Sequence, residues 1–216
     1  MTLLRPAFLW LLVGVLALVA IYAVMQSRRR HYAVRFTNLD LLKGTPRAVK
    51  VIERVGQMAD WGKKRDGRAL GFAFIDYSGS QVAGIVEISL NRPSGEIKVH
   101  NFWCTIDCGV AVQPDNVIAQ EESSIVYGLG VALSELITIK NGQVEQSNFY
   151  DYRVPRMKDV PAMHVEVIQT DNHPTGAGQM ATPLVAPAIA NAFAELTGVR
   201  LRRPPFTPER VKKALA

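Results

Sequence analysis

Gln179 stands between a glycine-rich turn and an apolar, helix-patterned run in the stretch HPTGAGQMATPLVAPAIANA, residues 173–192. Glycines let a backbone approach a ligand closely, and the first N–H groups of a helix attract an anion such as a phosphate. A carboxylate at this position could act as a general base, but the amide of Gln179 cannot take that proton. The stretch predicts either a ligand-facing loop, with Thr175, Gly176 and Gly178 in the turn, or a plain turn capped by Gln179.

A second group of polar residues lies in the stretch NVIAQEESS, residues 116–124. The amide of Gln120 can both donate and accept hydrogen bonds at the edge of a heterocyclic ring, although a glutamine on a polar helix face is the simpler interpretation. Glu121 and Glu122 are adjacent and would point about 100° apart on a helix, which makes them a poor acid/base pair. For Glu122 we expect a solvated helix face.

The sequence assigns no metal site to the cysteines and histidines. Cys104 and Cys108 lie in FWCTIDCGV, whose β-branched and aromatic residues predict a strand. Cα atoms four residues apart in a strand are roughly 13 Å apart, too far for a disulfide, so we expect two buried thiols. No metal-ligand spacing joins them to the four histidines, His31, His100, His164 and His173.

Strands and helices must position these residues, and they alternate without a regular βαβ repeat, which predicts an α+β fold. Apolar periodicity, turn residues and an Asn-Gly dipeptide mark the boundaries. The expected helices cover residues 46–62, 113–137 and 182–200, the last closed by Gly198, and the expected strands cover 69–77, 80–90, 96–109 and 163–170, with a hairpin at 137–146.

The amino-terminal part predicts a membrane anchor. Residues 7–25 carry no charged side chain over nineteen positions, roughly the length that crosses a ~30 Å hydrocarbon core as a helix. A cleaved signal peptide is the alternative, but the run is long and RRRH follows at once. The arginines after the run outnumber the one before it, which favours a single-pass membrane protein whose domain lies on the cytoplasmic side.

Charge is unevenly distributed along the 216 residues. Residues 26–68 carry twelve Lys and Arg against four Asp and Glu, and residues 197–216 carry six against one. Residues 69–196 carry six against fourteen, a net charge of −8. The overall charge of +6 therefore belongs to the two ends, and without a nucleic-acid motif it does not predict a nucleic-acid partner.

The residues from about 46 to 204 resemble a known family. The stretches from HNFWCTIDCGV to FYDYRVPRM, then PTGAGQ and APAIANAFAELTGVRLRRPP, occur in the same order in the carboxy-terminal part of the molybdenum-binding large subunit of the xanthine dehydrogenase and aldehyde oxidase family, especially in its isoquinoline 1-oxidoreductase branch. Separately, the first forty residues resemble the membrane leader of aerotolerance-type von Willebrand factor A domain proteins, but no adhesion-type metal motif follows them.

The larger resemblance implies a mixed strand and helix subdomain that binds part of a molybdopterin cofactor, commonly its cytosine dinucleotide form, beside molybdenum. It implies an oxidoreductase that hydroxylates N-heterocycles or aldehydes, with Gln120 near the pterin, Thr175, Gly176 and Gly178 in a cofactor-side loop, and Gln179 where active relatives carry the base glutamate. Family members are several times longer, and the isoquinoline-type enzymes carry iron-sulfur clusters on a small subunit. We therefore expect little or no activity from this chain alone, and a complementary large-subunit segment as partner.

The chain departs from the family at one further point. Ser123 and Ser124 replace a glycine pair, so their side chains could obstruct the close approach of a cofactor or of a neighbouring helix.

We divide the sequence into an anchor (1–30), a basic linker (31–45), the hydroxylase-like domain (46–206) and a basic tail (207–216). Two other hypotheses stay open: a non-catalytic interaction module held at the membrane, and a gene fusion near residues 43–46.

Overall fold

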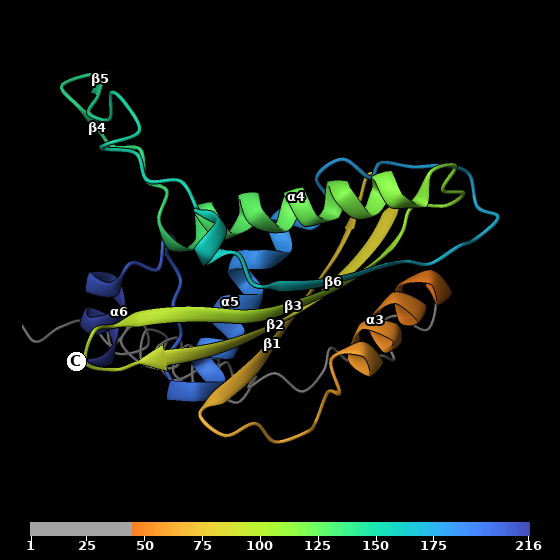
Figure 1. Ribbon diagram of the computed structural model, residues 1–216, viewed down its shortest axis with the longest axis horizontal. Coiled ribbons are helices and arrows are strands. Elements are labelled where there is room, and N and C mark those ends of the chain that lie inside the picture. The colour runs from red at the N-terminus through yellow and green to blue at the C-terminus, as the bar shows by residue number, and fades with distance from the viewer. Residues whose placement is uncertain (1–44) are drawn as a thin grey trace, which may run out of the picture. The chain divides into compact units, whose positions relative to one another are not determined.

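A four-stranded sheet organises residues 45–216, the part of the chain that the computed structural model describes (Figure 1). The strand order is β1-β2-β3-β6; the first three strands are antiparallel, and β6 runs parallel to β3. In chain order the elements are α3 (Pro46–Met58), β1 (Arg68–Tyr77), β2 (Ser80–Asn91), β3 (Glu96–Asp107), α4 (Pro114–Leu133), β4 (Ile139–Lys140), β5 (Gln143–Val144), a 3₁₀ turn (Met157–Asp159), β6 (Ala162–Val167), α5 (Thr182–Thr197) and α6 (Pro208–Leu215).

Helices cover both faces of the sheet. On β3, Phe102 packs beside Gly84 and Leu184 of α5, whereas Thr105 donates a hydrogen bond from its hydroxyl to the Val51 carbonyl of α3, 2.7 Å away. Side chains of a strand alternate between the two faces, so α5 and α3 lie on opposite sides. Nine consecutive residues of β2 are buried as a result, which fits a strand covered from above and below.

Two glycines allow the helices to pack closely. A Cβ on Gly71 of β1 would collide with the Ala188 carbonyl of α5, and a Cβ on Gly128 of α4 would lie 2.5 Å from the Val185 side chain. Neither position could hold a larger residue without moving α5. These contacts fix α5 between the sheet and α4, and thereby fix the start of α5, where the candidate site lies.

Most expected elements are confirmed, with differences at their ends. The Asn141-Gly142 turn has φ angles of 51° and 78°, as a type I′ hairpin turn requires, and α5 ends at Gly198 in the left-handed conformation. Helix α3 ends at Met58 rather than near residue 62, and α4 ends at Leu133. The mixed strand and helix architecture is the one that the α+β prediction describes.

The predicted basic tail is a helix instead. Residues Pro208–Leu215 form α6, which begins with the Thr207 hydroxyl accepting a hydrogen bond from the Arg210 N–H. The side chain of Val211 is fully buried, so the helix packs on the sheet domain. Val211 and the partly buried Leu215 are its apolar contacts with the core, and the lysines between them explain why charge dominates the sequence pattern. The predicted membrane segment, residues 7–25, lies outside the described residues; between residues 45 and 216 no helix has the length and hydrophobicity to cross a bilayer.

Candidate functional site

The loop that leads from β6 to α5 is fixed by a buried carboxylate at the end of β3. Asp107, fully buried, accepts hydrogen bonds from Nε and Nη2 of Arg47 at 2.8 and 2.9 Å. It also accepts one from the Thr170 hydroxyl at 3.0 Å and one from the Gly109 N–H at 3.0 Å. This carboxylate therefore joins α3, the end of β3 and the loop after β6.

Charge pairing keeps Asp107 ionised in spite of its burial. Burial alone would raise the pKa of Asp107, but the hydrogen bonds from Arg47, Gly109 and Thr170 outweigh it and lower that pKa below its ordinary value. The same contact raises the pKa of Arg47. A bidentate Arg–carboxylate pair is geometrically specific, so it sets the direction in which the loop leaves the sheet.

Thr175 and Gly176 anchor the glycine-rich turn to the sheet. The Thr175 hydroxyl lies 2.8 Å from the hydroxyl of Ser80, its N–H donates to the Cys108 carbonyl at 2.9 Å, and the Gly176 carbonyl accepts a hydrogen bond from Ser80. Each of these polar groups is therefore occupied within the protein. The geometry gives Thr175 a role in holding the loop rather than a free hydroxyl for a ligand.

Gln120, Gly178 and Gln179 come together at the surface where α4 meets the start of α5. A Cβ built on Gly178 would lie only 3.8 Å from Nε2 of Gln120. All three residues are exposed, and no hydrogen bond in the described part of the chain engages either glutamine side-chain amide. Two free amides and an open glycine backbone thus face outward from neighbouring elements.

Ser124 connects α4 to the loop instead of obstructing it. Its buried side chain donates from the hydroxyl to the Gly178 carbonyl at 3.5 Å, and its carbonyl accepts a hydrogen bond from the Thr182 hydroxyl at 3.2 Å. Ser123 is exposed on the outer face of α4. Ser124 therefore tightens the contact between α4 and the start of α5, whereas the sequence suggested a steric obstacle.

The start of α5 differs from the anion site that the sequence suggested. The helix begins at Thr182, whose N–H donates to the Gln179 carbonyl at 3.4 Å; the next residue, Pro183, has no N–H; and the Leu184 N–H donates to the Ala181 carbonyl at 3.0 Å. The first N–H groups of α5 therefore either donate to carbonyls of the chain or are absent, as at Pro183. A phosphate would find few free donors at this helix end.

Glu121 is the residue that sequence reasoning missed. Its side chain is fully buried, and neither carboxylate oxygen has a hydrogen-bond partner in the described structure. Burial raises the pKa of Glu121 to about 7, with a small opposing effect from the Ala181 N–H at the start of α5. The carboxyl is consequently close to half-protonated at neutral pH, directly beneath the loop that carries Gln179.

Two thiols face the same buried region. Cys104 and Cys108 are buried and free, as predicted. Burial raises the pKa of both thiols, and the charge of Glu121 raises them further. Neutral thiols are poor nucleophiles and poor metal ligands. No cluster of three or more metal-ligating side chains occurs within residues 45–216.

The spacing of apolar residues along the predicted helix indicated that Glu121 is buried. Ile125 and Gly128, four and seven residues further on, are both buried, so the 3.6-residue period places Glu121 on the inner stripe of α4. The partnership of Arg47 with Asp107 had no comparable signal, because sixty residues separate the two.

Comparison with known proteins points to one family. The family model described as the molybdopterin cofactor-binding domain matches residues 49–161. The isoquinoline 1-oxidoreductase subunit beta of Brevundimonas diminuta is 40% identical over 172 residues, which are 77% of this chain and 22% of that protein. The membrane-bound pyrroloquinoline-quinone aldehyde dehydrogenase of Gluconacetobacter polyoxogenes is 29% identical over 82% of this chain and 24% of that protein.

A solved structure shares the fold. Quinoline 2-oxidoreductase from Pseudomonas putida 86 aligns with a TM-score of 0.59 at 22% sequence identity, over 63% of this chain and 18% of that one. The chain therefore spans less than a quarter of the length of these relatives. No similarity of the first forty residues to von Willebrand factor A domain proteins emerges from the matches.

Proposed function

The chain belongs to the molybdopterin cofactor-binding domain family, and we propose that the edge between α4 and α5 forms one wall of the cofactor site of a molybdenum hydroxylase. The observation that carries the proposal is the pair of exposed, unpartnered amides of Gln120, which lies beside Gly178, and of Gln179, which follows it in the chain. Amides offer both donors and acceptors, which matches the heteroatom edge of a pterin. The open backbone at Gly178 allows close approach.

The residues present can bind and orient, but they do not provide the base. When bound, the molybdenum cofactor supplies the redox chemistry that hydroxylates an electron-poor carbon. Gln120 orients the cofactor through its amide. Gln179 occupies the position where the family resemblance places a glutamate, and it can hydrogen-bond there without removing a proton. Glu121, the nearby carboxyl with a pKa suited to a base, is fully buried and faces inward.

We propose that a further polypeptide completes the cofactor site. This chain covers only 22% of the length of the relative that is 40% identical to it. That relative is named as a subunit, which supports an assembly with a complementary large-subunit segment and an iron-sulfur small subunit. The cytosine dinucleotide form of the cofactor belongs to the same proposal. The other relative is named for pyrroloquinoline quinone, so the test below must identify the cofactor chemically.

The test is the molybdenum and pterin content of the full chain, purified from a host that makes the cofactor, with its natural partner polypeptides co-expressed. We expect both in stoichiometric amounts in the complex. Gln120→Ala should lower the content by about tenfold or more, on the scale of one lost hydrogen bond with its desolvation cost. Gln179→Glu should retain the cofactor and raise turnover by about 10² to 10⁴, the usual contribution of a general base.

Gln143→Ala, a change in the exposed hairpin strand β5, is the matched control and should leave the cofactor content unchanged. Absence of both pterin and molybdenum from the wild-type complex would refute the proposal and favour the non-catalytic interaction module. Bound cofactor with no turnover after Gln179→Glu would leave cofactor binding standing and reject the idea that only the base is missing.

For the amino-terminal region we propose a single-pass anchor formed by residues 7–25, with the domain on the cytoplasmic side. The support is the uncharged run of nineteen residues and the arginines that follow it. The full chain should remain in the membrane fraction after alkaline carbonate extraction; release into the supernatant would contradict the anchor.

A further inference from the structure

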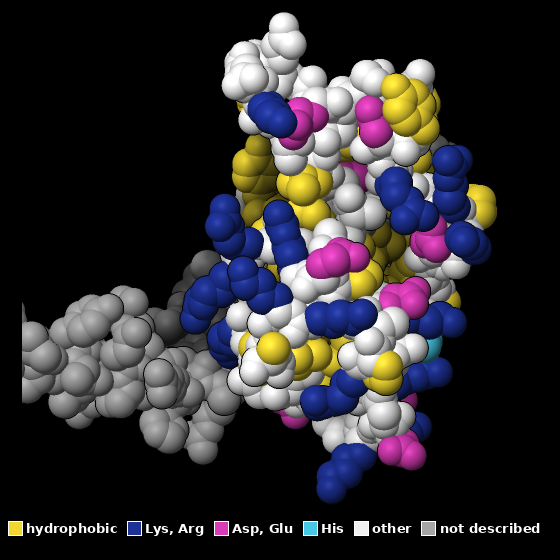
Figure 2. All heavy atoms as spheres, turned by 90° about the vertical axis from the view of Figure 1, so that its left-hand side faces the viewer, with side chains coloured by type: hydrophobic (Ala, Val, Ile, Leu, Met, Phe, Trp, Pro, Cys, Tyr) yellow, Lys and Arg dark blue, Asp and Glu magenta, His cyan; other side chains and the backbone are white. Residues whose placement is uncertain are grey.

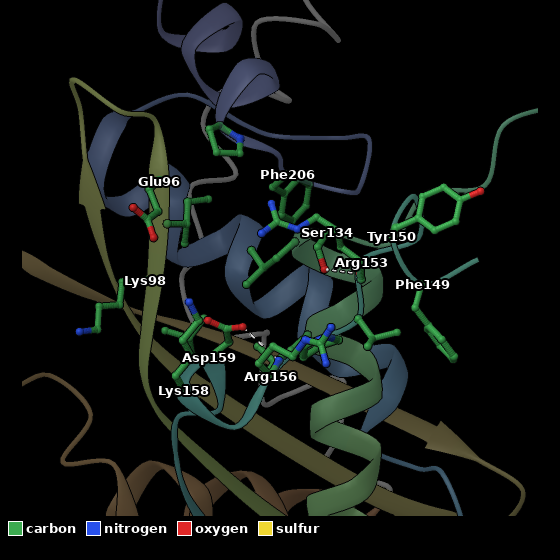
Figure 3. A pocket seen from close by; sticks show the side chains of 17 residues that line it. Glu96, Lys98, Ser134, Phe149, Tyr150, Arg153, Arg156, Lys158, Asp159 and Phe206 are labelled. Carbon is green, nitrogen blue, oxygen red and sulfur yellow. Dashed lines mark hydrogen bonds between the residues drawn. The ribbon is translucent and has the colours of Figure 1, made fainter. Parts of the chain in front are cut away.

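A pocket with a volume of about 800 Å³ lies at the far end of α4 from the glutamine pair. It is lined by the last turn of α4, the start of β3, the segment after the β4–β5 hairpin and the loop before α6 (Figure 3). Leu129 and Leu133 of its floor follow Gln120 by nine and thirteen residues, which is roughly 13 to 20 Å along a helix. The pocket is therefore separate from the proposed cofactor wall.

The floor of the pocket is apolar. Ile97 and Val99 of β3, Leu129 of α4 and Phe206 are all buried side chains that reach it. The volume lies within the range of roughly 300 to 1,000 Å³ that is common for small-molecule sites, and such sites combine an apolar lining with a few polar groups. An apolar body of moderate size is thus the kind of occupant that the floor fits.

Cations occupy one side of the pocket. Arg153, Arg156 and Lys158 come from a single segment, and in Figure 3 they lie between β3 and the end of α4, whereas Lys98 points away from the pocket. No ion pair joins any of the three to a carboxylate in the part of the chain that the structure describes. Even without Lys98, these three cations outnumber the two lining carboxylates, Glu96 and Asp159, and leave a net charge of +1.

Two carboxylates near these cations each accept a hydrogen bond from another group. Glu135, just outside the lining, accepts a hydrogen bond from the Tyr152 hydroxyl at 2.7 Å. Asp159 accepts one from the Arg156 backbone N–H at 3.0 Å. Two carbonyl oxygens at the end of α4, those of Gly130 and Ala132, already accept from the N–H groups of Ser134 and Phe206, which weakens their repulsion of an anion.

The segment that carries the cations is held in place. The Ser134 hydroxyl donates to the Arg153 carbonyl at 3.3 Å, and Pro155 lies against Gly130 of α4, 3.1 Å from where a Cβ would be. Figure 2 shows the surrounding face of the molecule, where Lys and Arg side chains surround hollowed apolar surface. A preformed arrangement binds a ligand with less ordering cost than a mobile one.

We propose that this pocket binds an organic anion, with its apolar body on the floor between β3, α4 and Phe206, and its carboxylate or phosphate head against Arg153, Arg156 and Lys158. A ligand for this pocket must have both the apolar body and the anionic head. An inorganic anion lacks the body that fills the apolar floor, and a neutral aromatic compound lacks the head that pairs with the cations.

The test is calorimetric titration of the full chain with three probes: 2-naphthoate, its neutral analogue 2-naphthamide, and inorganic phosphate. We expect 2-naphthoate to bind about tenfold or more tightly than either of the others, the scale of one charge-assisted contact. A parallel titration with octanoate distinguishes an aliphatic from an aromatic body, and tight binding of either acid supports the proposal. Equal binding of naphthoate and naphthamide, or binding of phosphate as tightly as naphthoate, would overturn it.

Variants assign the binding to this pocket. The double substitution Arg153→Gln/Arg156→Gln should weaken 2-naphthoate binding by about tenfold or more. Arg202→Gln/Arg203→Gln, which removes two exposed cations that do not line the pocket, should leave it unchanged. If the first pair does not fold, as judged by cooperative thermal unfolding, Lys158→Gln takes its place. Equal effects of the pocket and control variants would reject the assignment, and so would a lack of measurable binding of both 2-naphthoate and octanoate to the wild-type chain.

Discussion

Glu121 shows how one side chain can make stability depend on pH. Its ordinary pKa is 4.5, and burial raises the pKa to about 7 in the folded protein. Between these two values the unfolded chain has lost the proton while the folded chain retains it. The free energy of unfolding therefore falls as pH rises from 4.5 to 7, by about 3 kcal/mol for this group, and then levels off.

Substituting Glu121→Met should remove this dependence. Methionine has a similar volume and no charge, so we expect the variant to be more stable than the wild type above pH 7 by about 1 to 3 kcal/mol. Thermal or urea unfolding between pH 5 and pH 8 measures the effect. Glu122→Gln changes the half-exposed neighbour and is the matched control. A variant as sensitive to pH as the wild type in this range would show that Glu121 is not the titrating group.

Among the elements, α3 is joined to the end of β3 by one ion pair with a buried carboxylate, Arg47 with Asp107. Arg47→Met should leave the buried Asp107 carboxylate with only the Thr170 and Gly109 hydrogen bonds. We expect the free energy of unfolding at pH 7 to fall by about 2 to 3 kcal/mol. The pKa of Asp107 is lowered in the fold, so its contribution is present at neutral pH and disappears as pH falls through that lowered value. The difference between variant and wild type should therefore shrink in acid.

The same helix offers a control. Arg54 pairs with Glu166 at 2.6 Å, but both side chains are well exposed, and surface pairs contribute little. Urea unfolding of Arg54→Met should differ little from that of the wild type. If Arg47→Met and Arg54→Met were equally stable, the Arg47–Asp107 pair would contribute no more to stability than the surface pair.

Local sequence patterns predicted the helices and strands. Contacts between residues far apart in the sequence determine how these elements pack and hold the candidate site. Hydrophobic periodicity and turn residues identified the four long strands, and Gly198 marked the end of α5, because these signals act within a few residues. They also placed Gln120 and Gln179 on elements that the structure brings together. They could not show that Thr175 bonds to Ser80, ninety-five residues away, or that Val211 and Leu215 pack α6 against the core.

At the scale of the whole molecule, the outer face of α4 is unusually apolar for an exposed surface. Tyr127 is 69% exposed and Val131 is 45% exposed, and they follow Gln120 on the same helical face at spacings of seven and eleven residues. The chain spans less than a quarter of its relatives' length. We therefore expect the complementary large-subunit polypeptide to cover this face and thus to close the cofactor site beside Gln120.

Tyr127→Arg tests that arrangement. A charge placed in an apolar interface is costly to desolvate, so the variant should lose association with the co-expressed complementary segment by about a hundredfold, as interface aromatics commonly contribute 2 kcal/mol or more. Its own thermal unfolding should change little, because the side chain is exposed in the isolated domain. Val144→Arg, on the exposed hairpin strand β5, is the control. Analytical ultracentrifugation of the three complexes measures the association. If Tyr127→Arg and Val144→Arg associate as tightly as the wild type, the outer face of α4 is not the joining surface, and the remaining polypeptide must approach Gln120 from the α5 side.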